Sequence, residues 1–155
     1  LVPTAERLYP VGRLDRDSEG LLLLTNDGAL AERMLHPRYG MHRRYRVEVL
    51  GLFSERDLAR LRAGVQLEDG LSRPLRAEVI RRSERVSTLD LVLGEGRNRQ
   101  IRRTLEALGK RVHRLVRLSM GPIELGDLGS GHCRELTPTE VEALRWAVGL
   151  DGPES

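Results

Sequence analysis

The sequence has little cysteine, little lysine and no long apolar run. Its single cysteine, Cys133, has no second cysteine with which to form an internal disulfide, which suits a reducing compartment such as the cytoplasm. The longest apolar run, residues 21–24, is far shorter than the roughly 20 residues that cross a bilayer, so we expect no membrane span. The first ten residues also lack the basic start and apolar core of a signal peptide.

Motifs for metals, cofactors and common nucleophiles are missing as well. The four histidines, His36, His42, His113 and His132, lack the spacing of metal ligands, and His132 beside Cys133 is a lone pair. The sequence contains no glycine-rich phosphate loop and no Gly-x-Ser-x-Gly turn. We therefore expect chemistry performed by side chains alone, without a metal ion or a cofactor.

What the sequence does contain is arginine, in an uneven distribution. The chain has 155 residues, 39% of them hydrophobic and 32% charged, as in one folded domain with a substantial core. Its net charge is only +3, but 25 of its 26 basic residues are arginines, and between residues 97 and 117 only Glu106 opposes them. Genome composition or growth at high temperature could raise arginine usage, but neither explains the clustering. Arginine suits phosphates and base edges, so a polyanionic partner, preferably a nucleic acid, is indicated.

Helix and strand signals alternate irregularly along the chain, which predicts an α+β fold. The apolar run at residues 21–24 predicts a buried strand followed by a turn, and residues 66–74 predict a loop or a weak strand. Alternating apolar residues predict further strands at 45–49, 75–81, 86–93 and 112–118, the last ended by Gly121 and Pro122. Apolar spacing and caps predict helices at 29–35, 55–63, 101–108 and 138–148. We expect one domain over residues 1–150 and a disordered tail at 151–155.

The first segment that could carry chemistry is Gly12-Arg13-Leu14-Asp15, which leads into the apolar run. It can bring the Asp15 carboxylate to a strand end, with the Arg13 guanidinium nearby to favour the charged form that a nucleophile or base requires. By spacing alone, an ordinary turn with surface charges is the more common explanation of such a segment.

The second segment is Glu95-Gly-Arg-Asn-Arg-Gln-Ile-Arg-Arg103, which joins a strand to the start of a helix. Backbone amides at such a place attract phosphates. A solvated basic face and an RNA or phosphate site are equally good explanations of its four arginines. Tyr45, on an arginine-rich strand, could stack on a base or could be a buried tyrosine with a satisfied hydroxyl.

Taken together, these segments resemble the RsuA/RluB family of ribosomal RNA pseudouridine synthases. The matching segments occur in the family's order and cover most of the chain up to about residue 136. They are Tyr9-Pro-Val-Gly-Arg-Leu-Asp15, Glu19-Gly-Leu-Leu-Leu-Leu-Thr-Asn-Asp-Gly28, His36-Pro37, Tyr45 before Val47-Glu48-Val49, Glu95-Gly-Arg-Asn-Arg-Gln-Ile-Arg102, and Arg117 through Gly121-Pro122.

The resemblance implies a role for each matching residue. Asp15 corresponds to the catalytic aspartate, Tyr45 to the tyrosine that stacks on the uracil, and Arg102 to the basic residue that pairs with the aspartate. Arg13 corresponds to the arginine that helps displace the target base. The implied RNA contacts and pocket walls are Arg97, Asn98, Arg99, Gln100 and Arg103, and Leu14, Ile101 and Leu118, with Leu115 as the alternative to Leu118.

The family's fold is α+β, with a mixed, mostly antiparallel sheet flanked by helices and a catalytic cleft across the sheet. The implied activity is cofactor-free isomerisation of a uridine in ribosomal RNA, preferably of the large subunit. Apart from the resemblance, we expect a cytoplasmic protein and, by default, a monomer. A non-catalytic RNA-binding or ribosome-assembly module on the same fold is the alternative. A glycosidic-bond enzyme that uses Asp15 and Glu19 as a carboxylate pair is a third reading, without support for the required separation. Family members usually carry an N-terminal RNA-binding domain and a strand with a Lys-Pro pair, so we expect an N-terminally truncated chain.

Overall fold

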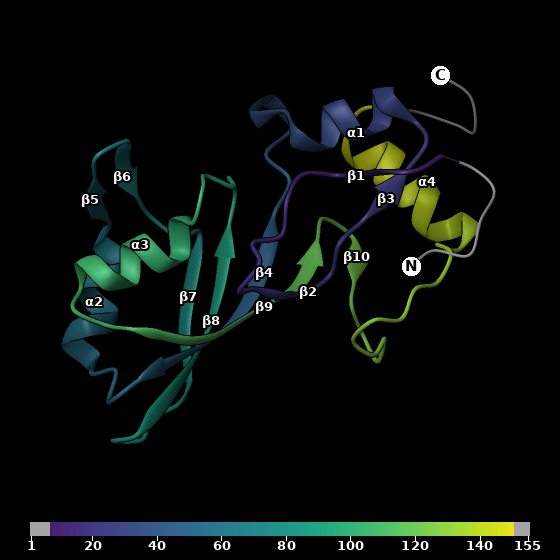
Figure 1. The fold of residues 1–155 in the computed structure, drawn as a ribbon. Helices are drawn as coiled ribbons and strands as arrows, with labels where there is room; N and C mark the ends of the chain where they lie inside the picture. Colours follow the sequence, from purple (N-terminus) through teal and green to yellow (C-terminus); the bar gives the residue numbers. More distant parts are fainter. Residues whose placement is uncertain (1–6, 151–155) are drawn as a thin grey trace.

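Helices and strands follow one another in mixed order in the computed structural model, which describes residues 7–150 (Figure 1). The strands are β1 (Tyr9–Pro10), β2 (Glu19–Gly20), β3 (Leu24–Thr25), β4 (Arg43–Leu50), β5 (Val65–Leu67), β6 (Gly70–Ser72), β7 (Arg76–Arg81), β8 (Val86–Leu93), β9 (Val112–Met120) and β10 (Ile123–Glu124). The helices are α1 (Gly28–Leu35), α2 (Glu55–Ala63), α3 (Gln100–Ala107) and α4 (Pro138–Ala147), with the 3-10 helix η1 (Pro37–Tyr39). The predicted α+β class is confirmed, whereas the tail at 151–155 lies outside the described residues.

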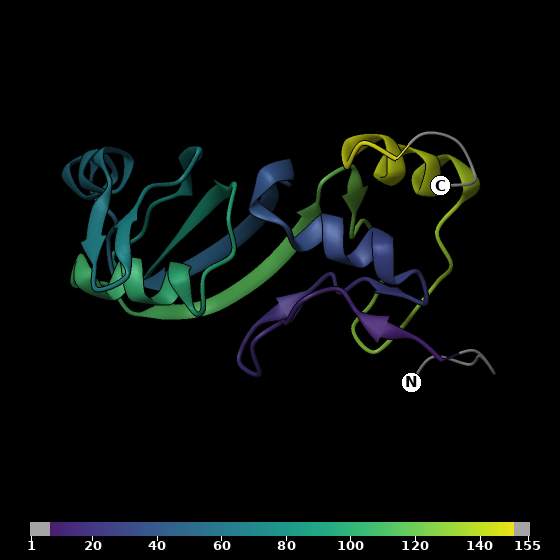
Figure 2. The ribbon, with the colours of Figure 1, turned by 90° about the horizontal axis from the view of Figure 1, so that it is seen from above.

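The main sheet connects the two halves of the molecule. Its order is β10-β9-β4-β8-β7, all antiparallel, and the short β2 pairs parallel with β9. Seen from above, β4 and β9 run from one lobe of the molecule to the other (Figure 2). The two lobes are therefore joined by continuous sheet.

The first lobe has its core between the sheet and helices α2 and α3. Residues of β8 alternate in burial along the whole strand, as expected for a sheet with one covered face. Leu89 and Leu91 pack there with Leu61 of α2 and Leu105 of α3, and all four are nearly inaccessible to solvent. The capping box of Ser54 and Asp57 fixes the start of α2.

The second lobe has a separate core under α1 and α4. Met34 of α1 and Leu144 of α4 pack there with Val11, Met120 and Ile123. A capping box of Thr137 and Glu140 fixes the start of α4. Because the two cores do not merge, the sheet between them is left open to a cleft.

One local prediction is wrong and another is refined. The run at residues 21–24 is not one buried strand: Leu21 and Leu23 are buried, but Leu22 and Leu24 are about two-fifths exposed. After Gly20 the chain no longer pairs with β9, and it pairs with β1 only at β3. Two short strands with different partners therefore replace the single strand that was predicted. Residues 66–74 contain the hairpin of β5 and β6, and Gly121-Pro122 form the tight turn from β9 to β10.

No helix in the described part of the chain is long and apolar enough to cross a bilayer.

Candidate active site

An open cleft of about 380 Å³ lies between the two cores. Residues 11–18 form one wall, and the loop that leads into α3, residues 96–101, forms the other. The floor consists of side chains from β4 and β9, the two strands that join the lobes. This volume accommodates a group of the size of a single nucleotide base.

Asp15 lies at the start of a tight turn on the first wall. The amide of Val11 donates to the carbonyl of Leu23 (2.8 Å), and the amide of Ser18 donates to the carbonyl of Asp15 (2.9 Å), so this wall is held at both ends. The Asp15 carboxylate is one quarter exposed, and its Oδ2 lies 4.0 Å from Nη1 of Arg99. A ligand in the cleft can therefore reach a carboxylate that has a cation within electrostatic range.

Tyr45 lies in the floor of the cleft, where its ring is available to a ligand, as a tyrosine that stacks on a base requires. It lies on β4 directly opposite Arg117 of β9, and Arg43 is two residues before it on the same face of β4. Tyr45 is half-buried, whereas Arg43 and Arg117 are only 8% and 4% exposed. In the floor, Tyr45 therefore has two buried arginines as neighbours, one along β4 and one across on β9.

A β-bulge decides which leucine of β9 faces the cleft. Arg44 pairs with Ser119 and Tyr45 with Arg117, so Leu118 has no partner on β4 and the strand shifts by one residue there. Leu115 lines the cleft and Leu118 does not. Leu118 is therefore wrong as the pocket wall, and Leu115, the alternative that the sequence left open, takes this place.

Arg102 was expected to pair with Asp15, and this expectation is also wrong. Its Nη2 donates to the backbone carbonyl of Asp17, and its Nε lies 3.4 Å from Oδ1 of the Asp17 carboxylate. The guanidinium of Arg99 binds the same carboxylate through two hydrogen bonds of 3.0 and 2.9 Å. These hydrogen bonds from Arg99 lower the pKa of Asp17 from 3.8 to about 2. Asp17 thus joins the first wall of the cleft to α3.

Arg99 has an unusual backbone. Its φ of 48° is in the left-handed region, where no other described non-glycine residue lies, and it is the N-cap of α3. Such a conformation disfavours a long side chain unless surrounding contacts impose it. The two hydrogen bonds to Asp17 provide such contacts, and they aim the guanidinium toward Asp15.

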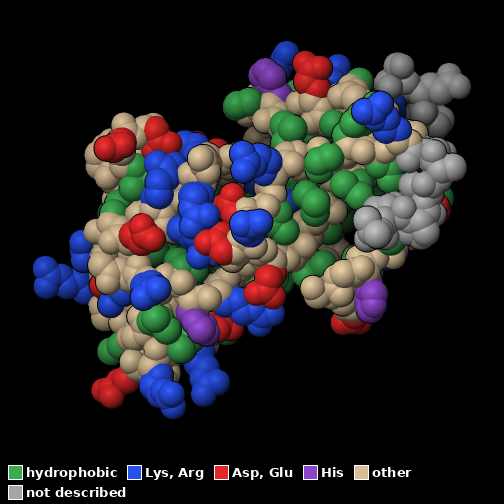
Figure 3. Space-filling view, in the orientation of Figure 1, with side chains coloured by type: hydrophobic (Ala, Val, Ile, Leu, Met, Phe, Trp, Pro, Cys, Tyr) green, Lys and Arg blue, Asp and Glu red, His purple; other side chains and the backbone are tan. Residues whose placement is uncertain are grey.

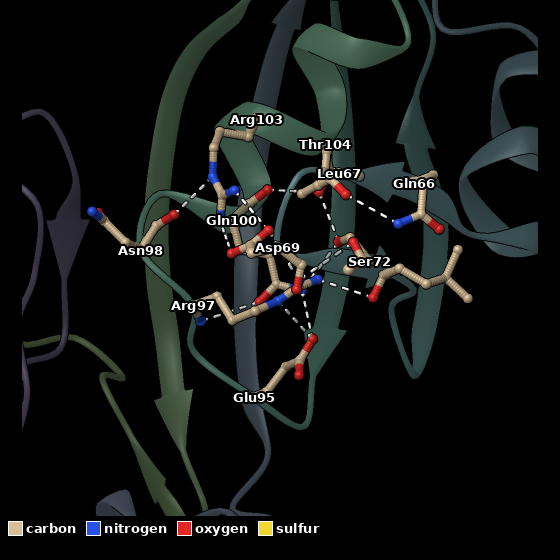
Figure 4. A network of polar contacts seen from close by, with 12 residues as sticks. Gln66, Leu67, Asp69, Ser72, Glu95, Arg97, Asn98, Gln100, Arg103 and Thr104 are labelled. Atoms are coloured by element: carbon tan, nitrogen blue, oxygen red, sulfur yellow. Dashed lines mark hydrogen bonds and ion pairs between the residues drawn. The ribbon is translucent and has the colours of Figure 1, made fainter.

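The other polar residues of this segment form a network directed toward the protein (Figure 4). Arg103 makes two 2.9 Å hydrogen bonds to the Asp69 carboxylate, and Arg97 donates to the same carboxylate and to backbone carbonyls of residues 69–71. Gln100 is 3% exposed and donates to Ser72 and Glu95. These contacts fix the hairpin of β5 and β6 against α3. The RNA contacts expected of these three residues stay predictions.

The remaining site residues that were predicted from sequence are at the cleft. Arg13 and Asn98 are exposed at its walls, Leu14 is half-buried, and Ile101 is buried against the first core. Figure 3 shows basic and acidic side chains side by side across the middle of this face, between the two lobes. Within residues 7–150, no group of three or more histidine, cysteine or carboxylate side chains is placed to hold a metal ion.

Comparison with known proteins decides the family. Residues 2–107 match the family model described as RNA pseudouridylate synthase. The chain belongs to this family. The match covers the first wall of the cleft, Tyr45 and the segment up to the end of α3, and the resemblance inferred from the sequence is confirmed.

Individual relatives agree with the family assignment. A protein of Aquifex aeolicus named "Uncharacterized RNA pseudouridine synthase" is 45% identical over 94% of this chain and 58% of its own length. The "Ribosomal large subunit pseudouridine synthase B" of Bacillus subtilis is 42% identical over 90% of this chain and 58% of its own length. A solved structure titled "Crystal structure of pseudouridylate synthase" matches with a TM-score of 0.77 and 32% identity, over 88% of this chain and 59% of that one. The pseudouridine synthase fold is thereby confirmed, and the chain spans about three-fifths of the length of these relatives.

Sequence reasoning did not assign a role to three residues at or beside this cleft. Asp17 was overlooked because Asp15, two residues earlier, matched the motif. Arg117 was named only as part of a matching segment and Arg43 not at all, since neither strand pattern nor charge count distinguishes a buried arginine from an exposed one. A usable signal was the position of both on the same sheet face as Tyr45 and Leu115, at sites where alternation expects apolar side chains.

Proposed function

We propose that the protein containing this chain is a pseudouridine synthase that isomerises a uridine in ribosomal RNA, with Asp15 as the catalytic carboxylate. The observation that carries the proposal is the convergence of Asp15 and Tyr45 in one open cleft with several guanidinium groups. Large-subunit RNA is the preferred substrate class, because the Bacillus subtilis relative is named a large-subunit enzyme.

The reaction exchanges one bond of uridine for another. The target base leaves its stack and enters the cleft, where its ring lies against Tyr45. With assistance from Asp15, the bond from ribose C1′ to ring N1 breaks and its electron pair remains on the ring. After the ring turns, its C5 bonds to C1′, the proton on C5 leaves, and N1 gains a proton. Atoms and electrons balance without a redox partner, so the residues of the cleft suffice for an isomerisation.

Asp15→Asn tests this proposal. We expect the variant to form no detectable pseudouridine in unmodified ribosomal RNA under single-turnover conditions, with RNA binding retained, since the amide keeps the shape of the carboxylate but not its charge. Chemical mapping of pseudouridine gives the readout, and binding is measured in parallel. Glu124→Gln, an exposed carboxylate change outside the cleft, is the control. Full turnover by Asp15→Asn would refute the role of Asp15.

The second candidate is a non-catalytic RNA-binding or assembly module. It is favoured by the pairing of Arg102 with Asp17, which leaves Asp15 without the expected partner. Binding of RNA by the wild-type protein without any pseudouridine formation would support it. We further propose that the protein acts in the cytoplasm, a reducing compartment in which the exposed thiol of Cys133 stays reduced, and that it is a monomer. Measurement of the molecular mass in solution tests the oligomeric state.

A further inference from the structure

The two arginines on the floor of the cleft have no counter-charge. Arg43 and Arg117 are each more than nine-tenths buried, and none of the ion pairs among the described residues includes either of them. They lie on one sheet face on both sides of Tyr45. Burial lowers the pKa of Arg43, and the charge of Arg117 also lowers it. Two buried cations without an anion are costly for a folded protein, so a role that requires them is indicated.

Neutral backbone carbonyls hold both side chains in place. Nη1 of Arg43 donates to the carbonyl of Met41 (3.0 Å), and Nε of Arg117 donates to the carbonyl of Leu21 (2.8 Å). The Nη2 of Arg117 is buried and has no hydrogen-bond partner among the described residues. Arg117 lines the cleft, and its guanidinium therefore keeps donor capacity beside the cleft that no described protein group uses.

The position of the pair favours a base carbonyl over a phosphate as the acceptor. Arg13 and Arg99 lie at the walls with exposed side chains, where the RNA backbone remains when a base is flipped out. The floor beside Tyr45 is reached by the inserted base. A phosphate would have to lose the hydration of a full negative charge to reach it, whereas the carbonyl of a neutral base loses much less.

We propose that Arg117, supported by Arg43, is a further catalytic residue that donates to a carbonyl oxygen of the target uracil and stabilises the ring as an anion. This inference rests on the proposed function. When the bond between C1′ and N1 breaks, the electron pair stays on N1 and delocalises onto the ring carbonyl oxygens. Desolvated donors fixed in advance stabilise such developing charge strongly. The charge disappears when C5 bonds to C1′, and the product stays neutral because N1 gains a proton as the C5 proton leaves.

The test compares uridine with 5-fluorouridine in the same target RNA. Fluorine withdraws electrons and stabilises the ring anion by itself, so the substrate needs less help from the protein. We expect Arg117→Met to lower the single-turnover rate on uridine about 100-fold, and to lower the consumption of 5-fluorouridine several-fold less. Arg117→Lys, which retains the positive charge, should lie between wild type and Arg117→Met. Nuclease digestion followed by mass spectrometry measures both substrates.

The ratio of the two rates within one preparation is independent of the fraction of variant that is folded, so destabilisation does not obscure the result. Arg114→Met is the matched control: Arg114 is on the same strand but is exposed and paired with Glu19, and its ratio should equal that of wild type. The inference would be overturned if the ratio for Arg117→Met equals that of wild type, or if the variant loses only RNA binding. Turnover by the wild-type protein in the same experiment would still support the proposed function. A wild-type protein that modifies no uridine would instead refute the proposed function.

Discussion

At the scale of single residues, two aspartates in one turn have separate tasks. Asp15 faces the cleft with Arg99 at 4.0 Å, whereas Asp17 makes the close contacts to Arg99 and Arg102. This division leaves Asp15 accessible from the cleft, while Asp17 holds the two guanidinium groups. Sequence spacing identified the motif, but two carboxylates that are two residues apart in a turn cannot be assigned to partners without the path of the backbone.

The charge of Asp17 predicts how stability depends on pH. Because its pKa is lowered in the folded protein, from 3.8 to about 2, its pairing stabilises the fold fully above about pH 4. This contribution is lost as the pH falls through the folded value. We expect Asp17→Asn to lower the urea midpoint slightly at pH 7, and the difference from wild type to shrink between pH 4 and pH 2.

Urea titrations at a series of pH values measure this difference. Asp127→Asn removes an exposed carboxylate that has no ion pair among the described residues, and it corrects for the change in net charge. A difference between Asp17→Asn and wild type that stays constant down to pH 2 would show that the ion pairs of Asp17 do not contribute to stability.

At the scale of elements, β9 determines the shape of the site. Its bulge at Leu118 sends Leu115, Arg117 and Met120 to the cleft face, and its parallel pairing with β2 brings the Asp15 turn beside the floor. The pairing requires close approach: a Cβ on Gly20 would lie 2.6 Å from the amide nitrogen of Arg117 and closer still to its carbonyl oxygen. Gly20 also has a φ of 108°, which disfavours any other residue.

Gly20→Ala is therefore expected to destabilise the protein by about 2–4 kcal/mol, through both the clash and the backbone strain. The change should also impair pseudouridine formation, because Arg117 must move to admit the methyl group. Gly28→Ala is the matched control, since a Cβ at Gly28, the first residue of α1, meets nothing within 4 Å. Urea unfolding measures both variants, and equal stability of the two would contradict the close packing of β2 on β9.

The elements differ in how well the sequence predicts them. The residues of α2, β7 and β8 follow a clear 3.6- or two-residue period, and those elements are found close to the predicted bounds. The prediction of one strand at residues 21–24 was wrong because apolar side chains indicate burial but not strand pairing. Here the chain connects β2, which pairs with β9, to β3, which pairs with β1. The bulge in β9 leaves no local signal, since it arises from the fit of the strand to β4.

At the scale of the whole molecule, two separate cores and a shared sheet create the cleft (Figure 2). The resemblance predicted from sequence brought Asp15 and Tyr45 into one site, and the structure places both at the cleft. The acidic residues that neutralise the basic segment could not be predicted, because Asp69 is on a hairpin and Asp17 in a distant turn. Arginine count therefore overstates the free positive charge of this surface.

This difference in free charge predicts the salt dependence of RNA binding. Each phosphate neutralised by a free arginine releases counterions and steepens the log-log plot of affinity against salt concentration. Arg13 is exposed at the cleft and has no ion pair within the described residues, whereas Arg103 is bound by Asp69 through two hydrogen bonds. We expect Arg13→Gln to reduce the slope by about 0.7 to 0.9, and Arg103→Gln to change it much less. Titrations of both variants and wild type with the same RNA measure the slopes. An equal reduction in both variants would mean that Asp69 releases Arg103 to the RNA, and that the network of Figure 4 rearranges when substrate binds.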